Sequence, residues 1–208
     1  MAPTPPSGAV RAGYALVTVL LVLTAAFCVL LTVSVVVGLA RDGDSLLYGD
    51  TLTVPYQLSP ESIGPMPPEL RLRGWVDVNV EVHDPTTEQM LLRTATDIGP
   101  SALFLAGLWL LRGFMRSVMK GDPFGSANVA RLRRLGFILV AGGPIVALVN
   151  YLLRLSLFDA IPAVPSVDLG VEGFSLPAGA LLGGMAVFIL AEVFAFGVRL
   201  REDAEGTI

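Results

Sequence analysis

One stretch near the N-terminus constrains the fold more than any other feature of the chain. Tyr14 to Ala40 is 27 residues long and contains no charged side chain. As a helix it extends about 40 Å, more than the ~30 Å hydrocarbon thickness of a bilayer. The apolar core of a secretory signal is only ~7–15 residues long. We therefore interpret this stretch as an uncleaved, tilted membrane span, although Gly38-Leu39-Ala40 weakly resembles a cleavage site.

The composition extends this interpretation to the whole chain. Of its 208 residues, 53% are hydrophobic and 15% are charged, and the mean hydropathy is +0.70. A soluble domain has about 25% charged residues. The net charge of −4 argues against a basic nucleic-acid-binding protein, and one cysteine excludes a disulfide scaffold.

Three further stretches predict membrane spans. Leu135 to Leu153 and Gly173 to Ala191 are each 19 uncharged residues, and apolar character continues from Ile98 past Arg112 to Met119. An arginine near a helix end can extend its guanidinium group to the headgroups. Four spans place both termini on one side, where nine Lys and Arg residues lie, against five on the other side. Because cytoplasmic loops carry an excess of basic residues, we expect both termini in the cytoplasm and the protein in the cell membrane.

The segment between the first two spans has the pattern of a sheet. From Leu70 to His83 apolar residues or Gly74 at even positions alternate with polar residues or Trp75 at odd ones, which predicts a half-buried strand. We expect Glu88–Thr96 to return as its partner, with Thr51–Gln57 and Val167–Val171 as weaker strand candidates. The predicted fold is an α-helical integral membrane protein with four transmembrane helices and a small β-rich extracytoplasmic insertion between the first and the second.

The predicted organisation follows the order of the chain. Cytoplasmic and extracytoplasmic segments alternate with the four spans. It comprises a cytoplasmic tail (1–13), transmembrane helix 1 (14–40), an extracytoplasmic β-rich segment (41–97), transmembrane helix 2 (98–119), a basic cytoplasmic loop (120–134), transmembrane helix 3 (135–157), an extracytoplasmic loop (158–175), transmembrane helix 4 (176–198) and a cytoplasmic tail (199–208).

Two ionisable residues lie within predicted spans, where charge is costly. Arg112 follows Ile98 by 14 residues and Glu192 follows Pro177 by 15, so each lies about 21–22 Å below the outer boundary. We predict that Arg112 and Glu192 form an intramembrane ion pair. The alternative is a proton or ion relay through Glu192, for which Asn150 is the one further polar station.

Several small or polar residues carry local predictions. Gly179 and Gly183 form a small-xxx-small pattern, which serves either helix packing within the bundle or a homodimer face. Gly142-Gly143-Pro144 should kink or loosen its helix, and Ser126 is the expected N-cap of the helix after the basic loop. Six basic residues between Arg112 and Arg134 suit anionic lipid headgroups or an acidic partner, although topology alone would also produce them.

No catalytic constellation is found in the sequence. It contains no His-Glu-x-x-His, no Gly-x-Ser-x-Gly and no Walker loop. The single histidine, His83, is predicted outside the membrane and the single cysteine, Cys28, within it, so they cannot form a dyad. We therefore expect no enzymatic activity, no metal site and no cofactor.

Two stretches carry a resemblance to a known family. The first lies in the basic loop and the second at the end of the last span. They are Gly121-Asp122-Pro123-Phe124, Asn128, Arg131-Leu132-Arg133 and Gly136, and then Leu190-Ala191-Glu192-Val193-Phe194, Gly197, Leu200-Arg201-Glu202-Asp203 and Glu205-Gly206-Thr207-Ile208. In this combination the chain resembles the bacterial membrane family called domain of unknown function 2975. It departs at Ala195-Phe196, where the family usually carries polar or basic residues.

The resemblance implies a four-span protein from an uncharacterised family, many members of which are encoded beside a small helix-turn-helix regulator. It also places both motif stretches at the cytoplasmic face, where the basic start of one helix and the acidic tail are expected to contact each other. This face is a candidate for docking a regulator or for lipid contact. Its residues, with the neighbouring arginine included, are Asn128, Arg131, Arg133, Arg134, Arg201, Glu202 and Asp203.

Two functions remain open at this point. The first is a non-enzymatic sensory or regulatory membrane protein, which couples the external β segment to the cytoplasmic docking face. The second is a small transporter or channel subunit, which would have to oligomerise because four spans offer no evident polar path. The expected partners are the bilayer, including anionic lipids, and the helix-turn-helix regulator, with homodimerisation also open and no direct contact with nucleic acid.

Overall fold

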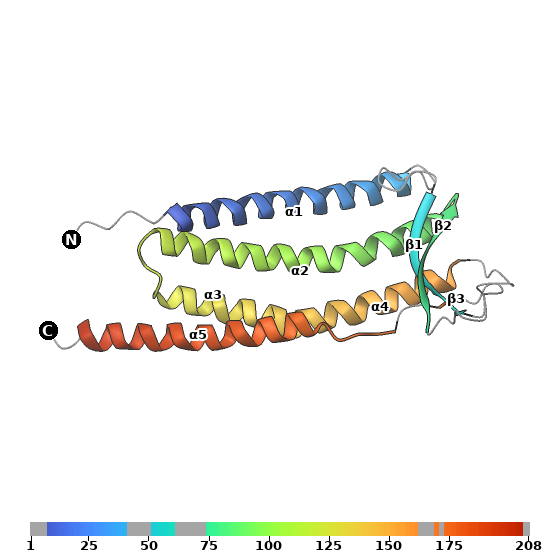
Figure 1. Ribbon diagram of the computed structural model, residues 1–208. Helices are drawn as coiled ribbons and strands as arrows, with labels where there is room; N and C mark the ends of the chain where they lie inside the picture. The colour runs from blue at the N-terminus through green and yellow to red at the C-terminus, as the bar shows by residue number, and fades with distance from the viewer. Residues whose placement is uncertain (1–7, 41–50, 61–73, 162–168, 171–172, 206–208) are drawn as a thin grey trace. The chain divides into compact units, whose positions relative to one another are not determined.

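A computed structural model describes residues 8–40, 51–60, 74–161, 169–170 and 173–205 (Figure 1). Most of these residues are helical, and a small sheet accounts for the strands. The elements in chain order are α1 (Gly8–Ala40), β1 (Thr51–Leu58), β2 (Val76–His83), α2 (Thr87–Met119), α3 (Ser126–Phe137), the π-helix η2 (Ile138–Gly142), α4 (Gly143–Asp159), β3 (Leu169–Gly170) and α5 (Ala178–Glu205).

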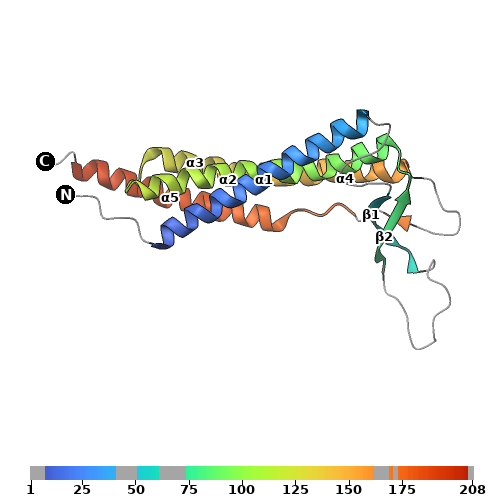
Figure 2. The ribbon, with the colours of Figure 1, turned by 90° about the horizontal axis from the view of Figure 1, so that it is seen from above.

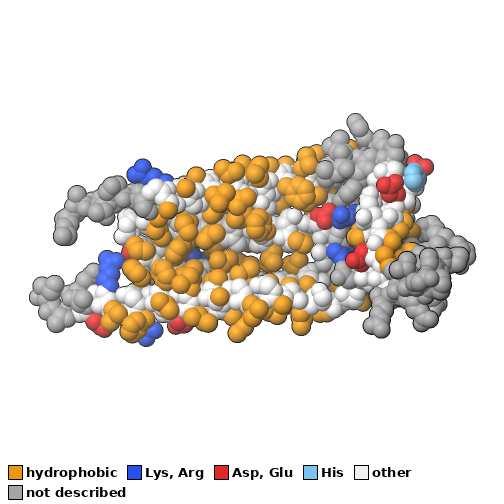
Figure 3. Space-filling view, in the orientation of Figure 1, with side chains coloured by type: hydrophobic (Ala, Val, Ile, Leu, Met, Phe, Trp, Pro, Cys, Tyr) orange, Lys and Arg blue, Asp and Glu red, His pale blue; other side chains and the backbone are white. Residues whose placement is uncertain are grey.

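Four helical stretches are long and apolar enough to cross a membrane. Large hydrophobic side chains lie on their surfaces, as the orange side chains in Figure 3 show. This supports a multi-pass membrane protein, since an exposed apolar surface of this extent suits lipid rather than water. The four stretches are Gly8–Val37, Thr87–Met119, Ser126–Asp159 and Ala178–Asp203.

The chain is divided into two compact units. Unit 1 comprises Met1–Cys28, Pro100–Ala147 and Leu176–Ile208, and unit 2 comprises Val29–Gly99 and Leu148–Ser175. The sheet belongs to unit 2. The turn between α2 and α3, together with α5, belongs to unit 1.

The sheet of unit 2 has the strand order β2-β1-β3, and both pairings are antiparallel. Figure 2 shows β1 and β2 side by side from a second direction. Leu52, Val54 and Tyr56 of β1 are buried together with Leu157 of α4 and form the core of the unit. The alternation predicted for β2 is confirmed over Val76–His83, which alternates half-buried and exposed side chains, whereas Gly74 and Trp75 are both exposed and precede the strand. The remainder of that prediction, 70–73, lies outside the described residues.

The predicted partner strand is wrong. Residues 88–96 are helical and belong to α2, which begins at Thr87, and the strand that pairs with β2 is β1. The reason is a capping box at the helix start: the Thr86 amide donates to Gln89 Oε1 at 2.9 Å, and the Gln89 amide donates to Thr86 Oγ1 at 3.3 Å. Gln89 Nε2 also donates to the Ala160 carbonyl at 2.8 Å, which holds the start of α2 beside the end of α4.

In unit 1 the helix after the turn is loosened as predicted. The π-helix Ile138–Gly142 interrupts it directly before Gly143 and Pro144. Here α3 and η2 pack closely on α5, because a Cβ on Gly184 would lie 3.0 Å from the Gly136 carbonyl oxygen and 2.6 Å from Val140 Cγ2. Close packing in unit 1 therefore depends on Gly136 and Gly184. At Gly179 and Gly183, the predicted packing pair, an added Cβ would meet no atom within 4 Å in the part of the chain described.

Candidate functional site

Several of the sequence-predicted residues meet at the end of unit 1 where α2 turns into α3. The turn requires Gly121, which has φ of +80°, and Ser117 Oγ donates to the Asp122 carbonyl at 2.9 Å. Helix α3 begins at Ser126, but its N-cap is Gly125, which makes no side-chain capping bond. The expected N-cap at Ser126 is thus wrong by one residue. A side chain at Gly125 would collide with the Asp122 carboxylate, which would lie 2.5 Å from its Cβ.

Asn128 holds this turn in place from the first turn of α3. Its side chain is fully buried, and Nδ2 donates to the carbonyl oxygens of Asp122 at 3.1 Å and Pro123 at 3.0 Å. Its Oδ1 accepts a hydrogen bond from Arg131 Nη1 at 2.6 Å. Both ends of a buried amide are therefore satisfied, which is the condition under which a buried polar group stabilises a fold.

The side chain of Arg131 passes over α2 at a glycine. A Cβ on Gly113 would lie 3.1 Å from Arg131 Nε, so any larger residue at this position would displace the guanidinium group. Arg131 is half-buried, and its nearest described acceptor is the amide of Asn128. Its role is thus to tie α3 to α2 as well as to orient that amide.

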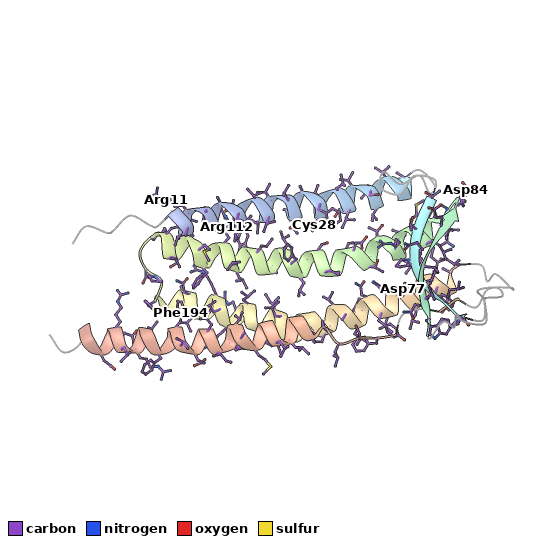
Figure 4. The ribbon with its side chains drawn as sticks, in the orientation of Figure 1. Arg11, Cys28, Asp77, Asp84, Arg112 and Phe194 are labelled. Atoms are coloured by element: carbon purple, nitrogen blue, oxygen red, sulfur yellow. The ribbon has the colours of Figure 1, made fainter. Side chains whose placement is uncertain are left out.

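Three phenylalanines close the same end of the unit. Phe194 of α5, labelled in Figure 4, packs edge-on against Phe114 at 5.6 Å between ring centroids and is tilted against Phe124 at 5.2 Å. Phe124 comes from the turn and lies on Gly197, where a Cβ would be 3.0 Å from its ring. The turn, α2 and α5 therefore share one aromatic contact, in addition to the polar contacts.

Two ion pairs join α5 to the rest of this end. Arg133 binds Glu192 Oε1 through Nη2 at 2.9 Å and Nε at 3.2 Å, and Arg201 Nη1 binds Asp122 Oδ1 at 3.1 Å. All four side chains are more than half exposed. In water such pairs contribute only about 0–1 kcal/mol each, so they orient α5 more than they stabilise it.

The predicted Arg112–Glu192 pair is replaced by two separate arrangements. Glu192 binds Arg133, and Arg112 extends from α2 toward α1 (Figure 4), where its Nε donates to Thr18 Oγ1 at 3.3 Å and its guanidinium carbon lies 5.6 Å from the ring centre of Tyr14. The physical reason is packing. Because α3 is the helix in close contact with α5, an arginine of α3 is nearer to Glu192 than one of α2.

The expected contact between the turn and the tail occurs with the charges exchanged. Arg201 of the tail binds the acid of the turn, Asp122. Glu202 and Asp203 are exposed at the end of α5, and Arg134 is exposed on α3. We call the residues that do converge the turn-end cluster. They are Asp122, Phe124, Asn128, Arg131, Arg133, Glu192, Phe194 and Arg201.

Thr18, Tyr14 and Gly113 contribute to this end but were not singled out from the sequence. None carries a local signal, because a threonine or tyrosine in an apolar helix is common and one glycine is uninformative. The chemistry of the assembled cluster is that of ion pairing and hydrogen bonding. Among the described residues, no group of three or more His, Cys, Asp or Glu side chains lies close enough to hold a metal ion.

The part of the chain that matches a known family contains the same residues. A model of the family described as protein of unknown function (DUF2975) matches residues 81–208, which is more than half of the chain and contains the whole turn-end cluster. The chain belongs to the DUF2975 family. No curated protein and no solved structure matches it.

Proposed function

We propose that this DUF2975 protein is a non-enzymatic sensory or regulatory protein of the cell membrane. In the proposed orientation both termini and the turn between α2 and α3 are cytoplasmic, and residues 41–97 are extracytoplasmic. The excess of basic residues around the turn supports this orientation. The turn-end cluster then acts as the support of a cytoplasmic docking face.

The observation that carries the proposal is that some basic residues of this end bind the cluster and others do not. Arg131, Arg133 and Arg201 bind other residues of the cluster. Four other basic side chains are exposed, and the described part of the chain supplies no acid or hydrogen-bond acceptor for them. They are Arg116, Lys120, Arg134 and Arg199. Topology alone would also place basic residues here, but these four side chains bind no described residue, and we assign them to an external acidic partner.

Two of these four positions are open to a soluble partner. Arg199 follows Glu192 by seven residues and Lys120 follows Arg112 by eight, so they extend about 10–12 Å beyond those two residues along their helices. This distance takes both side chains past the headgroup layer, which is ~5–8 Å thick on each side, so a soluble protein can reach them. We propose as the partner an acidic surface of a small helix-turn-helix regulator, the kind of protein that the family resemblance suggests.

Photo-crosslinking in cells tests the proposal. A benzoylphenylalanine replacing Arg199 should form an adduct that mass spectrometry identifies as a small helix-turn-helix protein. The adduct should fall several-fold when Arg116 and Arg134 are changed to glutamine, and the same probe at Leu182, an exposed position in the apolar part of α5, should not form it. Adducts with lipid alone, or an adduct unchanged by removal of the two charges, would contradict a regulatory docking face.

The transporter hypothesis receives no comparable support. A relay through Glu192 within one chain would need this carboxylate to line a path inside the unit. Instead its side chain is 62% exposed on the surface of unit 1 and is bound by Arg133.

A further inference from the structure

One face of α5 exposes large apolar side chains along nearly the whole helix. Their spacing of three or four residues keeps them on one side, opposite the buried Ala191 and Ala195. Each is between 54% and 68% exposed. We call this set the α5 stripe, and it consists of Leu182, Met185, Ile189, Val193, Phe196 and Leu200.

Contacts within unit 1 place charged residues of three helices at one level. Glu192 of α5 binds Arg133 of α3. Arg131, two residues before Arg133, lies over Gly113 of α2, which puts Arg133 close to the level of Arg112. We call the level of Arg112, Arg133 and Glu192 the charge level.

The hydrocarbon of a bilayer must end close to the charge level. If it extended seven residues further along α5, to Arg199, the corresponding lengths of α2 and α3 would also be immersed. Those lengths contain Arg116, Arg131 and the buried amide of Asn128. Burying that many charges in lipid is costly, whereas at the charge level the arginines can reach the headgroups.

The α5 stripe continues past this level, and the apolar surfaces of α1 and α2 do not. In α2 the exposed large apolar side chains end at Trp109, before Arg112, and in α1 they begin at Leu16, beside Thr18, to which Arg112 donates. In α5, Phe196 and Leu200 are 61% and 54% exposed beyond Glu192. Lipid therefore accounts for the exposed apolar side chains of α1 and α2 but not for the end of the α5 stripe.

We infer that the α5 stripe is the interface between two copies of this chain. A partner for it must present an apolar face both within the bilayer and beyond the charge level. Two parallel α5 helices related by a twofold axis along the membrane normal satisfy this requirement, because each position meets its equivalent at the same depth. The spacing averages 3.6 residues, the period of an ideal straight helix, so the stripe stays on one side of α5 without supercoiling. The inference rests on membrane insertion but is independent of the regulatory role.

Cysteine crosslinking in native membranes tests the inference. In a Cys28→Ala background, single cysteines replace Leu182, Ile189 or Phe196, and oxidation should give disulfide-linked dimers of the full chain. The matched controls are Leu190→Cys, exposed on a flank of the same helix, and Trp109→Cys, exposed on α2. We expect at least a five-fold higher dimer yield for the stripe positions. Equal yields at stripe and control positions, with the protein present in the membrane, would overturn the inference.

A second variant examines the part of the stripe that lies beyond the charge level. Phe196→Glu introduces a charge where two copies should meet and leaves the intramembrane part of the stripe unchanged. Dimer yield at a cysteine replacing Leu182 should then fall to the level of the Trp109→Cys control. An unchanged yield would show that this end of α5 is not covered by a second copy, and would likewise overturn the inference.

Discussion

In unit 2, strand β1 lies on Leu157 and is held by apolar side chains, whereas in unit 1 the turn after α2 is held by the amide of Asn128 and by side chains of α5. In both regions a non-helical segment of the chain is fixed against helices. Strand pairing provides hydrogen-bond partners for the backbone groups of the sheet, so apolar side chains alone can bury it. The turn has carbonyl oxygens without such partners, so it requires a buried polar donor. Substitutions in the two regions should differ accordingly.

The largest effect is expected in the apolar core of unit 2. Leu157→Ala removes a side chain that is 1% exposed, and should lower the free energy of unfolding by about 2–5 kcal/mol. Leu152→Ala, on the same helix and 52% exposed, is the matched control and should change it by less than about 0.5 kcal/mol. Thermal unfolding of the purified protein in detergent measures both. Equal effects would mean that the sheet does not rest on Leu157.

Two neighbouring glycines test the packing of unit 1. Gly184→Ala places a Cβ 2.6 Å from Val140 Cγ2 and 3.0 Å from the Gly136 carbonyl oxygen, and should cost about 1–3 kcal/mol. Gly183→Ala meets no described atom within 4 Å and should be neutral or stabilise by up to about 1 kcal/mol through helix propensity. The unfolding temperatures of the two variants should therefore move in different directions. The reverse order would place the close contact at the predicted pair instead.

The polar support of the turn is tested by a substitution of equal size. Asn128→Asp keeps an acceptor for Arg131 but replaces the Nδ2 donor, so an oxygen faces the carbonyls of Asp122 and Pro123. We expect a loss of about 1–3 kcal/mol and faster proteolysis at residues 120–125. Ser126→Ala removes a hydroxyl that makes no capping bond, and should leave cleavage unchanged. Equal protection in both variants would argue against a role of Asn128 in the turn.

Tyr56 offers a pH-dependent test of the sheet core. Its hydroxyl is buried without a hydrogen-bond partner among the described residues, and burial raises the pKa of Tyr56 to about 12. The neutral form is favoured by folding, so its contribution is complete below about pH 10 and is lost as the pH rises toward 12. Tyr56→Phe should stabilise unit 2 by up to about 1 kcal/mol and weaken this alkaline loss. If Tyr56→Phe were instead less stable, and its stability fell at alkaline pH as much as that of the unaltered protein, the Tyr56 hydroxyl would have a hydrogen-bond partner.

The smallest effect is expected at the exposed ion pair. Glu192→Gln removes a carboxylate that is 62% exposed and bound by Arg133, and should cost less than about 1 kcal/mol. Protein abundance in the membrane should stay near that of the unaltered chain, with Leu190→Gln on the same helix as a comparison. A loss of folded protein comparable to that of Leu157→Ala would instead indicate a desolvated pair.

These tests also reflect what the sequence could and could not predict. Uncharged runs longer than a bilayer is thick predict helices directly, and period-two alternation predicts β2. The strand assigned to 88–96 failed because the capping box of Thr86 and Gln89, a local signal, outweighs a weak strand pattern. The spacing of Thr86 and Gln89 in the sequence is that of a capping box.

The arginine that pairs with Glu192 could not be predicted from the sequence in the same way. Depth along a helix follows from residue number, which predicts similar depths for Arg112 and Glu192. Which arginine reaches Glu192 depends on which helices pack closely, and this depends on Gly136 and Gly184. One sequence contains four helices with small residues and does not specify which glycines face each other.

The position of the charge level relative to the bilayer is the central claim, and two exposed residues on α2 test it most directly. Trp109 and Arg116 flank Arg112 at about one turn on either side. In intact and inverted membrane vesicles, with Cys28→Ala as background, a membrane-impermeant maleimide should label Arg116→Cys from the cytoplasmic side only and should not label Trp109→Cys from either side. Protection of both positions, or labelling of Arg116→Cys from the outer side, would contradict the claim.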